Sequence, residues 1–280
     1  MKIGCHVSIA GSIDRSVDRA QRIDCDTFQI FTRNPRMWKS KKLEDKEVAS
    51  FKEKMDESSI GPVISHMPYL PNLSSSNSES YKKSVDTLEL ELKRCNTLGI
   101  PYVVTHLGSH LGKGEEKGRQ QVVNAINRVV SRFDKHPMIL LENTSGKTNE
   151  VGSTFKEIAD ILDEIKTEDI GICFDTCHAY ARGYNIASEN GLKETIDEIE
   201  ANVGLERVKV VHVNDSRGEL GSRMDRHHHI GFGNIGEKGF LNFLDSPFRD
   251  KPLILETPVD EVRTDKDNLE KLRELYLKVS

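Results

Sequence analysis

The sequence lacks the features that define several classes of protein. No apolar run approaches the roughly 18 residues that a membrane-spanning helix needs, and residues 1–6 contain no apolar secretory core. We therefore expect a cytoplasmic protein with no membrane partner. Cysteine is scarce and odd in number, with five residues, and no Cys-x-x-Cys pair occurs. Buried free thiols are therefore expected, rather than disulfides or a thiolate zinc site.

An excess of positive charge is also absent. The 280 residues include 45 acidic and 40 basic side chains, which give a formal net charge of -5. The field of the whole molecule therefore does not favour a polyanion, and any nucleic-acid site must be local. One basic stretch, residues 32–43, contains arginines, lysines and Trp38 but no acid. Taken alone, such a stretch is more typical of a solvated loop.

What the chain does contain is a series of short apolar runs separated by helical patterns. Continuous apolar runs are typical of strands in a parallel sheet that helices cover. The predicted strands are residues 2–6, 27–31, 62–66, 102–106, 138–142, 171–175, 209–213 and 253–256. Helical periodicity is found at residues 78–98, 120–133, 154–165 and 192–203, and Gly99 is a predicted helix C-cap.

Eight strand–helix units in about 250 residues predict an α/β fold, a (β/α)8 TIM barrel. The sequence shows no domain break, so a single domain over residues 1–280 is expected. An open doubly wound sheet is the alternative. None of the predicted strands runs directly into a G-x-G-x-x-G turn, so no nucleotide cofactor is expected.

Polar side chains stand where the predicted strands end. The last residues of seven strands are His6, Phe31, His66, His106, Glu142, Asp175 and Glu256, and His212 stands one residue before the end of the other strand. Because parallel barrel strands point the same way, their C-terminal ends converge on one face and place these side chains in one site. Imidazoles and carboxylates cannot be buried together there without a counter-charge, which metal cations supply.

Two further clusters extend this candidate metal site. His178 follows Asp175 by three positions, and a loop places Asp225 and His227 two positions apart. The nine candidate ligands are His66, His106, Glu142, Asp175, His178, His212, Asp225, His227 and Glu256. Each residue alone could have a structural role, but nine structural roles at equivalent positions would need many coincidences. Nine ligands suit two or three ions, and paired ions are the usual device for displacement at phosphorus.

With these residues in view, the sequence resembles the endonuclease IV family of apurinic/apyrimidinic (AP) endonucleases. The resemblance covers essentially the whole chain. Its motifs are Gly4-Cys5-His6-Val7-Ser8, Gln29-Ile30-Phe31-Thr32-Arg33-Asn34, His66-Met67-Pro68-Tyr69-Leu70, His106-Leu107-Gly108-Ser109-His110, Glu142-Asn143-Thr144, Phe174-Asp175-Thr176-Cys177-His178, His212-Val213-Asn214-Asp215-Ser216, Asp225-Arg226-His227-His228, Gly233-Asn234-Ile235-Gly236 and Leu255-Glu256-Thr257.

The resemblance implies a TIM barrel whose active site, at the C-terminal ends of the strands, binds three zinc ions per chain, with manganese possible in part. By match to the family, the first ion would be held by His66, His106 and Glu142. The second would be held by Glu142, Asp175, His212 and Glu256. The third would be held by His178, Asp225 and His227. Glu142, as the bridge between two ions, and Glu256, which orients or deprotonates the nucleophile, are the implied catalytic residues.

The implied activity is that of a zinc-dependent hydrolase of the deoxyribonuclease IV type, which acts in DNA base-excision repair. It would cleave the phosphodiester 5′ to an abasic site in duplex DNA, leaving a 3′-hydroxyl and a 5′-deoxyribose phosphate, and would also trim blocked 3′ ends. Arg36, Tyr69 and Leu70 match the residues that enter the minor groove of the DNA. A monomer is expected. Pro35 and Pro71, beside these residues, depart from the forms familiar in the family.

Two other functions fit parts of the pattern. Metal-dependent sugar isomerases and epimerases of the xylose isomerase-like barrel type share the barrel and the metal site, but they use fewer ligands. A non-catalytic module that binds damaged DNA would have no use for an activated nucleophile. The number of metal ions per chain and the reaction that the protein catalyses, DNA cleavage or sugar isomerisation, distinguish these alternatives.

Overall fold

Eight parallel strands form the wall of a TIM barrel in the computed structural model, which describes residues 1–279. They are β1 (Lys2–Cys5), β2 (Phe28–Ile30), β3 (Val63–His66), β4 (Tyr102–Thr105), β5 (Met138–Glu142), β6 (Ile170–Asp175), β7 (Val208–His212) and β10 (Pro252–Leu255). Every predicted strand is confirmed, with each end within one residue of its predicted position. The open doubly wound sheet is therefore wrong.

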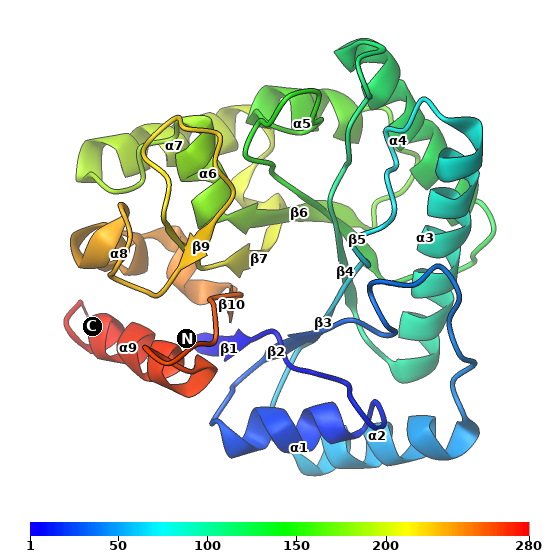
Figure 1. Ribbon diagram of the computed structural model, residues 1–280, viewed down its shortest axis with the longest axis horizontal. Helices are drawn as coiled ribbons and strands as arrows, with labels where there is room; N and C mark the ends of the chain where they lie inside the picture. Colours follow the sequence, from blue (N-terminus) through cyan, green and yellow to red (C-terminus); the bar gives the residue numbers. More distant parts are fainter. Residues whose placement is uncertain (280) are drawn as a thin grey trace.

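Helices surround the strands, so that the barrel has a helical outer layer (Figure 1). They are α1 (Arg15–Arg22), α2 (Asp45–Glu57), α3 (Ser78–Leu98), α4 (Glu115–Val130), α5 (Phe155–Leu162), α6 (Thr176–Arg182), α7 (Glu189–Asn202), α8 (Gly236–Leu244) and α9 (Asp265–Leu277). Two short 3-10 helices cover Leu205–Arg207 and Pro247–Asp250. As predicted, α3 ends at Gly99, which adopts the left-handed conformation with φ +79°.

Helix α4 begins at Glu115, earlier than the predicted start at residue 120. Gly114 serves as its N-cap, and two glutamates in the first turn favour the positive end of the helix. Gly118 lies inside this helix because a Cβ there would come within 2.7 Å of the His110 Cβ. The packing of α4 therefore requires glycine at position 118, a residue type that sequence patterns associate with turns.

The core has two parts, which follow from the alternation of side chains along each strand. The larger part lies between strands and helices and contains most of the buried aromatic residues. The smaller part takes one inward-facing residue from each of six strands: Ile64, Val104, Leu140, Cys173, Val210 and Ile254. All five cysteines are buried and free, as predicted.

The barrel closes at a seam between β1 and β2, the two strands at the ends of the hydrogen-bonded order. One parallel bridge joins His6 to Gln29 across this seam. The Val7 N–H also donates to the Gln29 carbonyl at 2.8 Å. Gln29 is thus the residue of β2 through which the two edges of the sheet meet. Within the described residues, none of the helices combines the length and hydropathy of a membrane span.

Candidate metal centre

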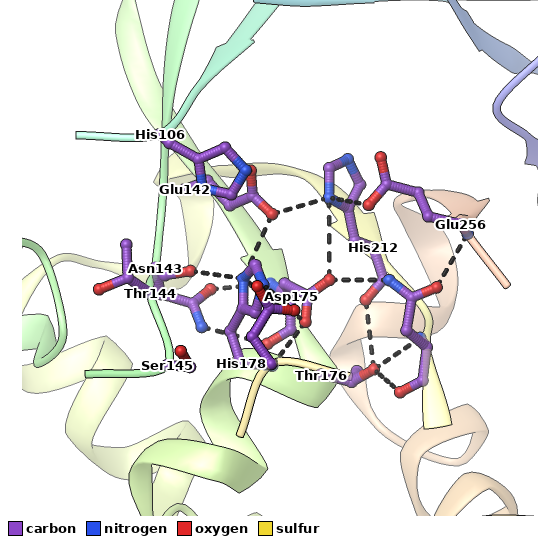
Figure 2. Close-up of polar contacts among 12 residues, drawn as sticks. His106, Glu142, Asn143, Thr144, Ser145, Asp175, Thr176, His178, His212 and Glu256 are labelled. Atoms are coloured by element: carbon purple, nitrogen blue, oxygen red, sulfur yellow. Dashed lines mark hydrogen bonds and ion pairs between the residues drawn. The ribbon is translucent and has the colours of Figure 1, made fainter. Parts of the chain in front are cut away.

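Six of the predicted ligands lie at the mouth of the barrel because each stands two positions after an inward-facing core residue. The pairs include Ile64 with His66 and Leu140 with Glu142. Side chains two apart on a strand point the same way, so the ligands continue the inner face of the barrel beyond its apolar part. Figure 2 shows the carboxylate of Glu142 between the rings of His178 and His212.

The other three predicted ligands come from α6 and from a loop. His178 lies in the first turn of α6, where its backbone N–H donates to the Asp175 carboxylate at 2.6 Å. Two short strands, β8 (Asp215–Ser216) and β9 (His227–His228), pair antiparallel. Asp225 lies on the loop between them, and His227 is the first residue of β9. This pairing folds the loop back over the barrel mouth. These strands were not predicted, because two residues show no periodicity.

The structure brings all nine predicted ligands together. Ligand atoms within 4.8 Å of one another form three groups that match the implied division: His66, His106 and Glu142; Glu142, Asp175, His212 and Glu256; and His178, Asp225 and His227. A further grouping includes Cys177 with Asp175 and His227. Burial raises the pKa of Cys177 to about 12, so its thiol is protonated in the absence of a metal.

Hydrogen bonds fix the orientation of three of the imidazoles. The Nδ1 atoms of His66, His178 and His227 lie 2.6–3.0 Å from the carbonyls of Met67, Asn143 and Glu256 respectively. A carbonyl only accepts, so Nδ1 carries a proton, and in the neutral ring Nε2 is the nitrogen that presents a lone pair.

These Nε2 lone pairs point into the site. The His66 Nε2 lies 3.2 Å from Glu142 Oε2, and the His178 Nε2 lies 3.3 Å from Asp225 Oδ1. The buried Nε2 of His227 has no hydrogen-bond partner among the described residues. Lone pairs that face carboxylate oxygens are the arrangement that a bound cation completes, so this donor set fits metal ions.

The pKa values of Glu142 and His178 also indicate that positive charge stabilises the site. Burial alone would raise the pKa of Glu142, but His106 and His212 outweigh it and hold that pKa well below its ordinary value. Burial would lower the pKa of His178, but Asp175 and Asp225 raise it well above the ordinary value. Without a cation, a second proton on His178 balances the carboxylates, and a divalent cation would displace that proton from Nε2.

The predicted DNA-contacting residues lie beside this site. Ligand side chains line a cavity of about 430 Å³ together with Phe31 and Tyr69. A neighbouring cavity of about 660 Å³ is lined by Phe31, Pro35, Arg36 and Tyr69. Tyr69 is 65% exposed and meets the Phe31 ring edge-on. Leu70 is exposed next to Tyr69 but lines neither cavity.

Buried charges anchor the loop that carries Arg36. Arg33 Nε lies 2.9 Å from Glu91 Oε1, and both side chains are almost completely buried. The Arg33 guanidinium donates to the Trp38 carbonyl, and the Arg94 guanidinium donates to the carbonyls of Thr32 and Lys41. Residues 32–43 are therefore not simply a solvated loop, because Arg33 is buried and pairs with Glu91.

Several site residues were not predicted. The Asn143 side chain accepts from Asp175 N–H, and Asn214 Nδ2 donates to Asp175 Oδ2 at 2.8 Å. Each lies one or two positions after a ligand, which is the signal that could have identified them. Lys147 Nζ lies 2.8 Å from Asp225 Oδ2, and no local pattern predicts that contact.

The backbone of the glycine-rich segment 231–236 binds a carboxylate of the chain itself. Backbone N–H groups of Gly231, Gly233 and Ile235 donate to the two oxygens of Asp215. A Cβ at Gly233 would come within 2.5 Å of Asp215 Oδ1, so the close approach requires glycine. This segment therefore fixes the loop between β8 and α8.

Known proteins share both the sequence and the fold of this chain. The family model described as "Xylose isomerase-like TIM barrel" matches residues 17–278. A protein of Methanoculleus marisnigri named "Probable endonuclease 4" is 53% identical over 276 residues, covering 98% of each chain. One of Nitrosopumilus maritimus with the same name is 48% identical over 278 residues, covering 98% of this chain and 99% of its own.

Solved structures agree with the sequence relatives. The crystal structure of endonuclease IV from Thermus thermophilus has a TM-score of 0.88 and 36% identity, covering 99% of this chain and all of that chain. A D-tagatose 3-epimerase-like protein has a TM-score of 0.75 at 21% identity, covering 100% of this chain and 98% of its own. That likeness extends to the fold alone, whereas the full-length relatives above share the sequence as well. The chain therefore belongs to the endonuclease IV family, among the xylose isomerase-like TIM barrels.

Proposed function

We propose that this protein is a DNA-repair AP endonuclease that cleaves the phosphodiester 5′ to an abasic site in duplex DNA, leaving a 3′-hydroxyl and a 5′-deoxyribose phosphate. It would also trim blocked 3′ ends, and it would act as a monomer and a single domain. The observation that carries the proposal is the convergence of nine imidazole and carboxylate side chains in three adjoining groups at the barrel mouth. A mere DNA-binding module would not need such a set.

The three groups would each hold one zinc ion, and manganese could replace zinc in part, because both accept imidazole and carboxylate ligands. Glu142 belongs to two of the groups and would bridge their ions. When bound, the ions would supply charge stabilisation for the phosphate oxygens and would lower the pKa of water. Three divalent ions outweigh four carboxylates, so the site would attract an anionic phosphodiester despite the net negative charge of the whole protein.

Glu256 is the proton acceptor that the chain itself offers. Burial alone would raise its pKa, but the neighbouring His212 outweighs that effect and holds the pKa at about 2, so the side chain is an anion at neutral pH. Its carboxylate lines the cavity of about 430 Å³. From there Glu256 can orient the water that attacks phosphorus and accept its proton.

Arg36, Tyr69 and Leu70 would position the DNA. Tyr69 belongs to both cavities, so it stands between the metal centre and the Arg36 loop. An exposed aromatic ring beside an exposed leucine can fill the gap that a missing base leaves in the stack. An abasic step costs the least unstacking energy because one base is already absent, and this favours damaged over intact DNA.

A nicking assay tests this proposal. The substrate is a duplex with one tetrahydrofuran abasic mimic, the control is the same duplex without the lesion, and metal content is measured on the same preparation. We expect one incision 5′ to the lesion and about three zinc ions per chain. Equal cutting of the undamaged duplex would contradict the proposal, as would full activity after the metal is removed.

A further inference from the structure

Gln29 is a buried amide at the seam of the barrel whose side chain contacts two of the proposed metal ligands. It is fully buried, yet it is neither a proposed ligand nor a proposed DNA contact. Its backbone bridges β2 to β1 at His6. Its side chain reaches His212 and Glu256, which are at the ends of β7 and β10. A buried amide needs partners for both ends of its side chain, and these contacts supply them.

The contacts of Gln29 allow only one orientation of the amide. Its Nε2 lies 2.7 Å from Glu256 Oε1 and 3.0 Å from His6 Nδ1, and its Oε1 lies 2.9 Å from His212 Nε2. The reverse orientation would place the amide oxygen against the Glu256 carboxylate, where two acceptors would repel. Gln29 therefore donates to Glu256 and His6 and accepts from His212.

This orientation determines the state of His212. An amide oxygen only accepts, so the His212 Nε2 carries a hydrogen and the Nδ1 presents a lone pair. That Nδ1 lies 3.0 Å from Glu142 Oε1 and 3.4 Å from Glu256 Oε2. Gln29 also donates a hydrogen bond to Glu256 Oε1, so Oε2 is the carboxylate oxygen that remains available to bind an ion. One side chain thus arranges two members of the second ligand group.

His212 differs in this respect from three of the other four candidate histidine ligands. His66, His178 and His227 are each oriented by a backbone carbonyl, which no substitution of a side chain removes. His212 is oriented by a side chain that holds a second ligand at the same time. A substitution of Gln29 alone can therefore change the orientation of His212.

We propose that Gln29 is a positioning residue that sets His212 and Glu256 for the ion of the second ligand group. The inference rests on the proposed function, because it requires that the site binds metal. Loss of the Gln29 hydrogen bonds would weaken that one ion about 10–100-fold, the usual effect of removing a partner that orients a ligand. The ions of the first and third groups keep their own ligands and orienting carbonyls, so they should be retained.

Two variants and one control test the inference. Gln29→Met keeps the volume of the side chain but removes every side-chain hydrogen bond, whereas Gln29→Glu keeps an acceptor for His212 Nε2 but replaces the donor to Glu256 with a second acceptor. Gln120→Glu, on the outer helix α4, controls for the change of charge. Zinc per chain is measured along a chelator series, and the protonation of His212 is read from the ¹⁵N spectrum of histidine-labelled protein. Thermal unfolding of the metal-free proteins compares their folds.

The expected results are specific to the second ligand group. Gln29→Met should release one zinc ion at a chelator concentration about 10–100-fold lower than wild type, with kcat reduced and KM for the abasic duplex unchanged. Its His212 signal should become a mixture of the two tautomers, and Gln29→Glu should restore the wild-type signal. Gln120→Glu should match wild type throughout.

Two results would overturn the inference while leaving the proposed function in place. One is wild-type zinc retention in Gln29→Met. The other is equal loss of all ions together with a lower melting temperature of the metal-free variant, which would show a structural role only. A wild-type protein that binds no zinc would overturn the proposed function and this inference together.

Discussion

Replacing Glu91, a buried carboxylate of α3, by glutamine should destabilise the protein strongly. Glu91 is completely buried against the guanidinium of Arg33, and Thr32 donates to its other oxygen at 2.5 Å. The variant keeps the shape of the side chain but leaves Arg33 and the nearby Arg94 without a buried counter-charge. Removing one partner of a buried ion pair costs about 3–5 kcal/mol.

The effect is large enough to measure by thermal unfolding. About 1 kcal/mol shifts Tm by roughly 2–4 °C in a domain near this size, so Glu91→Gln should lower Tm by about 6–20 °C. The matched control is Glu89→Gln on the same helix, which removes ion pairs with Lys93 and Arg132 near the surface. Each such pair contributes about 0–1 kcal/mol, so the control, which loses two of them, should lower Tm by at most about 8 °C and by less than Glu91→Gln does.

The same variant should affect DNA binding, because the buried charges anchor the loop that carries Arg36. We expect a higher KM for the abasic duplex at an unchanged kcat and unchanged zinc content. Circular dichroism gives the melting curves, and the nicking assay gives the kinetic constants. If Glu91→Gln melts as Glu89→Gln does, the reasoning about the buried cluster is wrong.

Three further predictions concern DNA contact, chemistry and acid stability. Arg36→Ala should weaken binding of the abasic duplex and reduce the slope of log affinity against log salt by about one, as titrations at several salt concentrations would show. Glu256→Gln should lower kcat by about 10²–10⁴-fold, the usual contribution of a general base, with little change in affinity for the duplex; an unchanged kcat would exclude that role. Asp14→Asn tests the acid stability that the Asp14 carboxylate provides. Burial alone would raise the pKa of Asp14, but hydrogen bonds from Ser12, Lys54 and Ser50 outweigh burial and lower that pKa from 3.8 to about 2. Because the folded pKa is the lower one, the carboxylate stabilises the protein above about pH 4, and the difference in stability between wild type and Asp14→Asn should disappear as the pH falls towards about 2; a constant difference would refute this.

The sequence predicted the barrel well because its strands and helices follow local rules. Each strand is a continuous apolar run, and α3 has a recognisable cap at both ends, Asn77 and Gly99. The start of α4 was missed because its glycine is there for close packing against His110. The β8–β9 hairpin was missed because strands of two residues leave no periodic signal.

The candidate site was predictable to the extent that it depends on strand ends. His66 and Glu142 follow inward-facing residues by two positions, so their convergence follows from strand geometry alone. The roles of Gln29 and Lys147 were not predictable, because each depends on a contact with a residue far away in the sequence, His212 and Asp225 respectively. Nothing in a linear pattern specifies such contacts.

The nine candidate ligands are spread over the ends of six barrel strands, one helix and the β8–β9 hairpin, and this has a consequence for assembly. The second group takes its members from β5, β6, β7 and the end of β10, which lie side by side in the sheet, whereas the first group also needs His66 and His106 from β3 and the end of β4. A fragment without β3 and β4 would therefore offer full sets for the second and third groups only. The complete set of ions would be captured only when both halves of the barrel are present, so its binding free energy would add to the stability of that state alone, and full metal uptake would report that the chain has finished folding.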